Sequence, residues 1–80
     1  MRIYIGNLSY VTAVEDLKKL FAPYGTIEDA FIVKDRATDI SKGFGFIDMP
    51  DEQARAAIKA LSGTVLAGRK LRINEAAPKK

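Results

Sequence analysis

Residues 42–49, KGFGFIDM, decide the fold of this chain. Two aromatic residues alternate with small or apolar ones, a period of two that is typical of a β-strand. Because successive side chains of a strand point to opposite faces, Phe44 and Phe46 share one face, and Ile47 and Met49 share the other. The octapeptide therefore predicts a strand with an apolar side and an aromatic side.

Three further strands and two helices are predicted around this octapeptide. Alternation or apolar runs indicate strands over about 2–6, 26–34 and 70–74, and a short apolar piece at 65–66 precedes the last of them. Helical spacing predicts one helix over about 13–22, with a capping box formed by Thr12 and Glu15, and a second one introduced by Pro50 and closed by Gly63. The resulting order, βαββαβ, predicts an α+β, ferredoxin-like sandwich. Since two helices cover one face of a four-stranded sheet, the other face is expected to be open.

The composition favours one small globular domain and removes the central residue of most enzyme mechanisms. The chain has 80 residues, 48% of them hydrophobic, and a net charge of +3. It has neither cysteine nor histidine, so thiol nucleophiles, imidazole bases and the usual soft metal ligands are missing, and no cofactor or metal is expected. No apolar run has the length of a signal core or membrane span, which predicts a soluble, cytoplasmic protein. We expect one domain over 1–76 and a short basic tail over 77–80.

The open face of the predicted sheet carries aromatic and cationic side chains. Alternation directs Ile3, Ile5, Ile47, Leu71 and Ile73 towards the helices. It leaves on the open face Arg2, Tyr4, Phe31, Val33, Lys42, Phe44, Phe46, Asp48, Lys70, Arg72 and Asn74. A soluble monomer rarely exposes such an aromatic cluster without a ligand, and flat rings stack on nucleobases while cations meet phosphates.

Two segments in the predicted central strands resemble family motifs. Residues 42–49 resemble the RNP octamer, and residues 3–8, IYIGNL, resemble the RNP hexamer of the RNA-recognition motif family. The similarity extends over nearly the whole chain and is greatest to small single-domain RNA-binding proteins of bacteria. It implies that Tyr4 and Phe46 each stack a base, that Phe44 packs against sugars, and that Lys42 contacts a phosphate.

The predicted site extends beyond these motifs. Phosphate or polar contacts are expected from Arg2, Asn7, Lys42, Arg72 and Asn74. Phe31 and Val33 either extend the RNA surface or pair with their cross-strand neighbours. Gly43 and Gly45 are interpreted as packing residues that let the helix layer approach the strand.

Two positions depart from the family pattern. Met49 replaces an aromatic residue but is expected in the core. Asp39 follows Thr38 where the family usually has glycine, and Asp tolerates the left-handed region better than most residues.

Three functions compete at this point. The first is non-catalytic binding of single-stranded RNA, in post-transcriptional regulation or RNA chaperoning, by a monomer without a membrane partner; single-stranded DNA is the alternative ligand. The second is a protein-interaction module on the same fold. The third, a hydrolase of acyl phosphates, lacks an anion-cradling loop, and we expect no enzyme activity.

Overall fold

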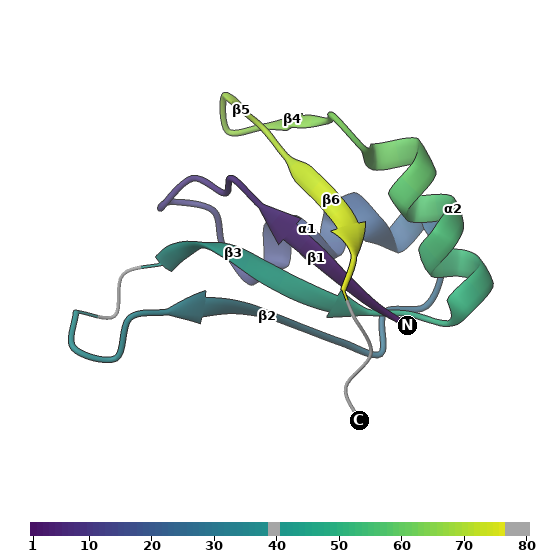
Figure 1. Ribbon diagram of the computed structural model, residues 1–80, viewed down its shortest axis with the longest axis horizontal. Helices are drawn as coiled ribbons and strands as arrows, with labels where there is room; N and C mark the ends of the chain where they lie inside the picture. The colour runs from purple at the N-terminus through teal and green to yellow at the C-terminus, as the bar shows by residue number, and fades with distance from the viewer. Residues whose placement is uncertain (39–40, 77–80) are drawn as a thin grey trace.

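A computed structural model describes residues 1–38 and 41–76, with the backbone alone described at Ser41 and Lys42. It contains one antiparallel sheet of four strands in the spatial order β2-β3-β1-β6 (Figure 1). The strands are β1 Arg2–Gly6, β2 Asp29–Lys34, β3 Ser41–Asp48 and β6 Arg72–Glu75. The helices are α1 Val14–Phe21 and α2 Asp51–Leu61, and a 3-10 turn, Ala22–Tyr24, follows α1. The predicted ferredoxin-like α+β fold is confirmed.

The core lies between one face of the sheet and the two helices. Ile3, Ile5 and Ile47 are fully buried, and Leu71 and Ile73 nearly so, as alternation predicted. They pack in one apolar cluster with Leu17, Phe21, Ala54, Ala57 and Leu61 of the helices. Met49 is fully buried in this cluster, so its departure from the aromatic pattern is absorbed by the core. The other face of the sheet is left without a covering helix, and α1 lies behind the sheet in Figure 1.

The segment before the last strand differs from the prediction. A small antiparallel hairpin, β4 Val65–Leu66 and β5 Arg69–Lys70, turns at Ala67 and Gly68, which both have positive φ. The main-sheet strand β6 then begins at Arg72, two residues later than expected. Lys70 therefore belongs to the hairpin, and its Cε lies 3.4 Å from the position of a Cβ built on Gly63. The prediction that Lys70 belongs to the last strand of the main sheet was wrong, because the hairpin interrupts the alternation on which that assignment rested.

The start of α1 also differs from the predicted capping box. The backbone N–H of Ala13 donates to Asp16 Oδ2 at 2.9 Å, so Asp16 and not Glu15 reaches back to the helix start. Thr12 is buried, and its Oγ1 has no hydrogen-bond partner among the described residues. The helix begins one residue later than the sequence pattern suggested, and this moves the capping carboxylate by one position.

The structural reason for a glycine at position 45 differs from the predicted one. A Cβ at Gly45 would lie 2.6 Å from the carbonyl oxygen of Phe31 and 3.1 Å from the Cα of Ile32, both in the neighbouring strand β2. The absence of a side chain therefore permits the close approach of β2 and β3. Gly43 has a φ of +89°, a backbone conformation that residues other than glycine rarely adopt. Gly45 remains a packing residue, but it packs against β2 and not against the helix layer. Gly43 is explained by its positive φ and not by packing, since a Cβ there would lie at an ordinary 3.6 Å from the carbonyl oxygen of Leu8.

Three predictions fall on parts that the structure does not describe. Asp39, the side chain of Lys42, and the tail 77–80 lie outside the described residues. In the adjoining loop, Asp35 Oδ1 accepts hydrogen bonds from the backbone N–H groups of Ala37 and Thr38, at 2.8 and 3.2 Å. None of the helices formed by the described residues has both the length and the apolar character needed to cross a bilayer.

Candidate nucleic-acid interface

A row of side chains crosses all four strands on the open face. Strand pairing places Phe31 of β2 opposite Phe46 of β3, Phe46 opposite Tyr4 of β1, and Tyr4 opposite Asn74 of β6. Phe44 lies two residues before Phe46 in β3, opposite Gly6 of β1. The four aromatic side chains are partly exposed, and Asn74 is exposed. The sheet thus brings together aromatic residues from three strands that are far apart in the sequence.

The four rings form one contiguous aromatic platform, the name used below for Tyr4, Phe31, Phe44 and Phe46. The centroid of Phe46 lies 5.5 Å from that of Phe31, 5.8 Å from that of Tyr4 and 6.1 Å from that of Phe44. Tyr4 and Phe44 are 5.9 Å apart with an interplanar angle of 33°. These separations are those of interacting aromatic pairs. Phe31 is therefore part of the platform, whereas Val33 lies at a register shift between Ile32 and Lys34.

Gly6 creates the space in which the Tyr4 ring lies. A Cβ at Gly6 would be 2.7 Å from Tyr4 Oη, 2.9 Å from Cε2 and 3.0 Å from Cζ, all shorter than ordinary contact. The Tyr4 side chain therefore extends along β1 over the backbone of Gly6. This places its hydroxyl at the end of the strand where Arg72 pairs with Gly6.

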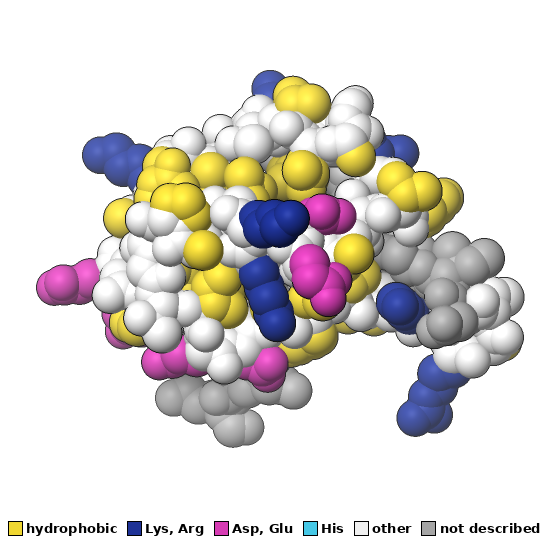
Figure 2. Space-filling view, turned by 180° about the vertical axis from the view of Figure 1, so that it is seen from behind, with side chains coloured by type: hydrophobic (Ala, Val, Ile, Leu, Met, Phe, Trp, Pro, Cys, Tyr) yellow, Lys and Arg dark blue, Asp and Glu magenta, His cyan; other side chains and the backbone are white. Residues whose placement is uncertain are grey.

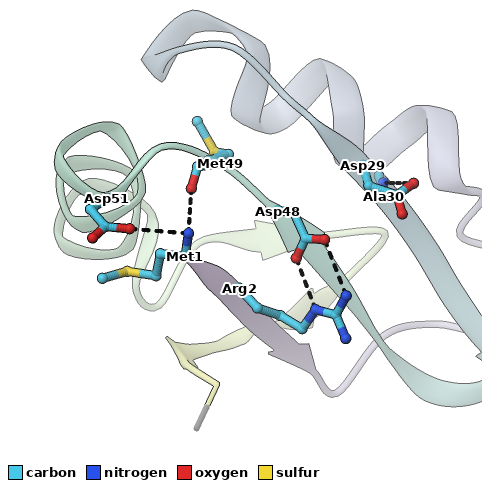
Figure 3. A network of polar contacts seen from close by, with 7 residues as sticks. All are labelled: Met1, Arg2, Asp29, Ala30, Asp48, Met49 and Asp51. Atoms are coloured by element: carbon cyan, nitrogen blue, oxygen red, sulfur yellow. Dashed lines mark hydrogen bonds and ion pairs between the residues drawn. The ribbon is translucent and has the colours of Figure 1, made fainter. Parts of the chain in front are cut away.

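Arg2 is held at the opposite end of the platform by a carboxylate. Its Nε donates to Asp48 Oδ1 at 2.8 Å and its Nη2 donates to Oδ2 at 3.1 Å (Figure 3). The guanidinium carbon lies 5.3 Å from the ring centroid of Phe31 and 5.7 Å from that of Phe46. The hydrogen bond from Arg2 lowers the pKa of the Asp48 carboxyl, and it raises the pKa of Arg2. Arg2 thus lies beside the platform, as predicted, with its charge balanced.

Asn7 holds the β4–β5 hairpin against the end of β1. Its Nδ2 donates to the carbonyl oxygen of Lys70 at 2.7 Å, and its Oδ1 accepts from Arg69 Nη2 at 2.8 Å. Asn7 has φ of +62°, a left-handed conformation that asparagine tolerates better than most residues. Both polar atoms of its amide are engaged within the protein, so Asn7 orients other groups at the rim.

Arg69 is a cation that the sequence did not indicate. It is 62 positions from Asn7, and no local pattern links the two residues. Arg69 and Arg72 line a cavity of about 320 Å³ together with Tyr4, Tyr10 and Phe44. Tyr10 is 72% exposed there. The cavity is continuous with the platform because Tyr4 and Phe44 belong to both.

The charges of the open face are distributed unevenly. At the end where β1 begins, Asp29 lies directly opposite Asp48, and Asp48 pairs with Arg2. At the end where β1 stops, Arg69 and Arg72 have no ion-pair partner among the described residues. The opposite face, on which α1 lies, is seen in Figure 2 and carries Lys and Arg side chains beside Asp and Glu side chains near the centre of the view. Uncompensated positive charge beside aromatic rings is therefore found at the Arg69 and Arg72 end.

A larger cavity, of about 750 Å³, lies away from the platform centre. It is formed between residues 10–15 and the outer strand β2, with Ala30, Phe31, Ile32 and Lys34 on its β2 side. Val11 is 82% exposed in this region. The lining is mainly apolar, and this distinguishes it from the smaller cavity with its two arginines.

Comparisons with known proteins agree with this geometry. The profile of the RNA recognition motif matches residues 3–72. RbpD of Nostoc sp. is 45% identical over 99% of this chain and 85% of its own length. The crystal structure of RNA Binding Protein PG1 has a TM-score of 0.94 and 42% identity, covering 100% of this chain and 98% of that one. The Rna15 RRM with bound RNA (GU) has a TM-score of 0.83 and 27% identity, covering 96% of this chain and 83% of that one. Profile, relatives and structures concur that this chain belongs to the RNA recognition motif family.

Proposed function

We propose that this chain binds single-stranded RNA, without catalysis, on the aromatic platform of its open sheet face. The observation that carries the proposal is the contiguous set of partly exposed rings with cations at its margin. Tyr4 and Phe46 each offer a flat surface to a base, and Phe44 lies beside both, where it contacts the intervening sugars. A binder of this kind would act in post-transcriptional regulation or as an RNA chaperone.

The related proteins support an RNA ligand. RNA Binding Protein PG1 covers this chain from end to end, and the Rna15 RRM was solved with RNA bound. Both share the sheet that carries the platform here. What those proteins bind is proposed for this chain because the platform supplies the chemistry for it: rings for bases and guanidinium groups for phosphates.

The competing function is a protein-interaction module. The larger cavity beside β2 favours it, since Tyr10 and Val11 are exposed there and β2 is an edge strand of the sheet. RNA is preferred because four rings lie together on the open face, whereas the cavity beside β2 contains one of them, Phe31. The two functions differ in their dependence on salt, since phosphate contacts release counterions and apolar protein contacts do not.

Leucine substitutions on the platform test the proposal. Tyr4→Leu and Phe46→Leu keep an apolar side chain but remove the flat ring, and each is expected to weaken binding of a short mixed-sequence RNA by at least roughly fivefold. Tyr24→Leu is the matched control, because Tyr24 packs against the core from the 3-10 turn. Unchanged affinity in both platform variants would refute the proposal, as would equal losses in all three.

A further inference from the structure

The Arg69 cavity has features of a binding subsite that the family motifs do not include. Its volume of about 320 Å³ is close to the lower end of ligand pockets, which span roughly 300–1,000 Å³. Tyr10 contributes an exposed ring, and Arg69 and Arg72 contribute positive charge. The cavity therefore offers both a stacking surface and anion-binding groups.

Arg69 is oriented before any ligand arrives. Its Nη2 donates to Asn7 Oδ1 at 2.8 Å, and Asn7 is itself fixed through Nδ2 to the backbone of Lys70. One nitrogen of the guanidinium is used in this way, which leaves the remaining donors of the planar group for an anion. A side chain held by such an anchor loses less rotational freedom on binding than a free arginine does.

The charge distribution favours phosphate binding at this end of the sheet. At the other end, Asp29 and Asp48 face each other across β2 and β3, and Arg2 is occupied by Asp48. A phosphate there would meet a balanced ion pair and a further carboxylate. Near Arg69 and Arg72, none of the described residues that line the cavity is acidic.

We propose that the cavity is a subsite for one further nucleotide of the RNA strand, with its phosphate between Arg69 and Arg72 and its base or sugar against Tyr10. This inference rests on the proposed function, because the strand reaches the cavity from the rings of Tyr4 and Phe44. It predicts that the protein binds a strand longer than the platform alone requires. The subsite adds affinity mainly through one phosphate, so its contribution decreases as salt rises.

A length series of RNA tests the subsite. Calorimetric titrations would measure the affinity of four proteins for a mixed-sequence dinucleotide, tetranucleotide and hexanucleotide. The proteins are the wild type, Arg69→Met, Arg72→Met and a control variant, Arg55→Met. Arg55 is an exposed cation of α2, so its substitution removes the same charge outside the open face. With the longer strands, each open-face variant is expected to bind roughly tenfold more weakly than the wild type, whereas the dinucleotide is bound equally by all four proteins.

The outcomes separate this inference from the function on which it rests. If the wild type binds none of the strands, the proposed function fails. If the wild type binds and neither methionine variant loses affinity for the longer strands beyond the loss of Arg55→Met, the subsite is refuted. Equal losses at all three lengths also refute it, since the arginines would then act on the platform itself. A hexanucleotide with one neutral methylphosphonate linkage at each position in turn gives a second readout. At one linkage the substitution should weaken binding by the wild type clearly more than binding by Arg69→Met, which keeps only Arg72 at that phosphate.

Discussion

Substitution of Gly6 by alanine tests how the platform is built. The new Cβ would lie 2.7 Å from Tyr4 Oη, 2.9 Å from Cε2 and 3.0 Å from Cζ, whereas ordinary contacts are 3.4–4 Å. The ring must move away, and its centroid lies 5.9 Å from Phe44 and 5.8 Å from Phe46, so the platform changes with it. Because a stacked base contributes ~1–3 kcal/mol, we expect affinity for RNA to fall roughly five- to 150-fold.

The same substitution should leave the fold intact. Gly6 has no positive φ, so alanine fits the backbone, and replacing glycine within a strand gains about 0.5–1 kcal/mol of backbone entropy. Loss of the contacts between Tyr4 and its aromatic neighbours offsets this gain by a similar amount, about 0.5–1.5 kcal/mol. Chemical unfolding should therefore show a net change within about 1 kcal/mol, while fluorescence anisotropy with a short RNA shows the loss of affinity.

A double-mutant cycle identifies the cause. In a Tyr4→Ala background the ring is gone, and Gly6→Ala should have no further effect on RNA affinity. If Gly6→Ala weakens binding equally in both backgrounds, the loss does not pass through Tyr4. The inference that the missing side chain of Gly6 provides the space for the Tyr4 ring would then be wrong.

Three other residues give predictions of different kinds. Asp48→Asn removes an ion pair in which the hydrogen bond from Arg2 lowers the pKa of Asp48. The stabilisation from this pair is small because both side chains are partly exposed. It is present above the ordinary pKa of the carboxyl group and is lost as the pH falls through the lowered pKa of Asp48. Unfolding of the wild type and Asp48→Asn should therefore differ at neutral pH and converge in acid, and a constant difference would contradict this. Asp16→Ala should reduce the free energy of unfolding by about 1 kcal/mol through loss of the helix cap, and Glu15→Ala by much less; equal effects would contradict the observed capping. Arg72→Gln should reduce the slope of log affinity against log salt by about 1, and Lys59→Gln, on α2, should leave the slope unchanged.

Most of the fold could be predicted because strand alternation and helical spacing agree along the chain. β1 was predicted with its observed bounds, and the buried isoleucines of β1, β3 and β6 follow from a period of two. The errors occur at positions where a few local hydrogen bonds determine where a helix or strand begins. Asp16 and Glu15 are adjacent carboxylates, and the position of the first helical residue determines which of them caps. The β4–β5 hairpin is too short to produce a periodic signal.

The aromatic part of the site could also be predicted, because a strand's alternation determines its face. The polar part could not. Arg69 is positioned at the site by its hydrogen bond to Asn7, which lies 62 positions earlier in the sequence. The pairing of Arg2 with Asp48 depends on the register of β1 and β3. Both are contacts between distant segments, and single-sequence patterns carry little information about them. The sequence therefore predicts ligand contacts for Asn7 and Arg2 but gives no indication of the hydrogen bonds that both make to other protein groups.

Chemical-shift mapping with a short single-stranded RNA tests the central claim most directly. If the platform is the binding surface, the largest perturbations should fall on the aromatic ring resonances of Tyr4, Phe44 and Phe46, with backbone changes along β1 and β3 and few in α2. The perturbations should weaken as salt rises. Perturbations confined to the cavity between residues 10–15 and β2, or to the helices, with the three rings unchanged, would contradict the account.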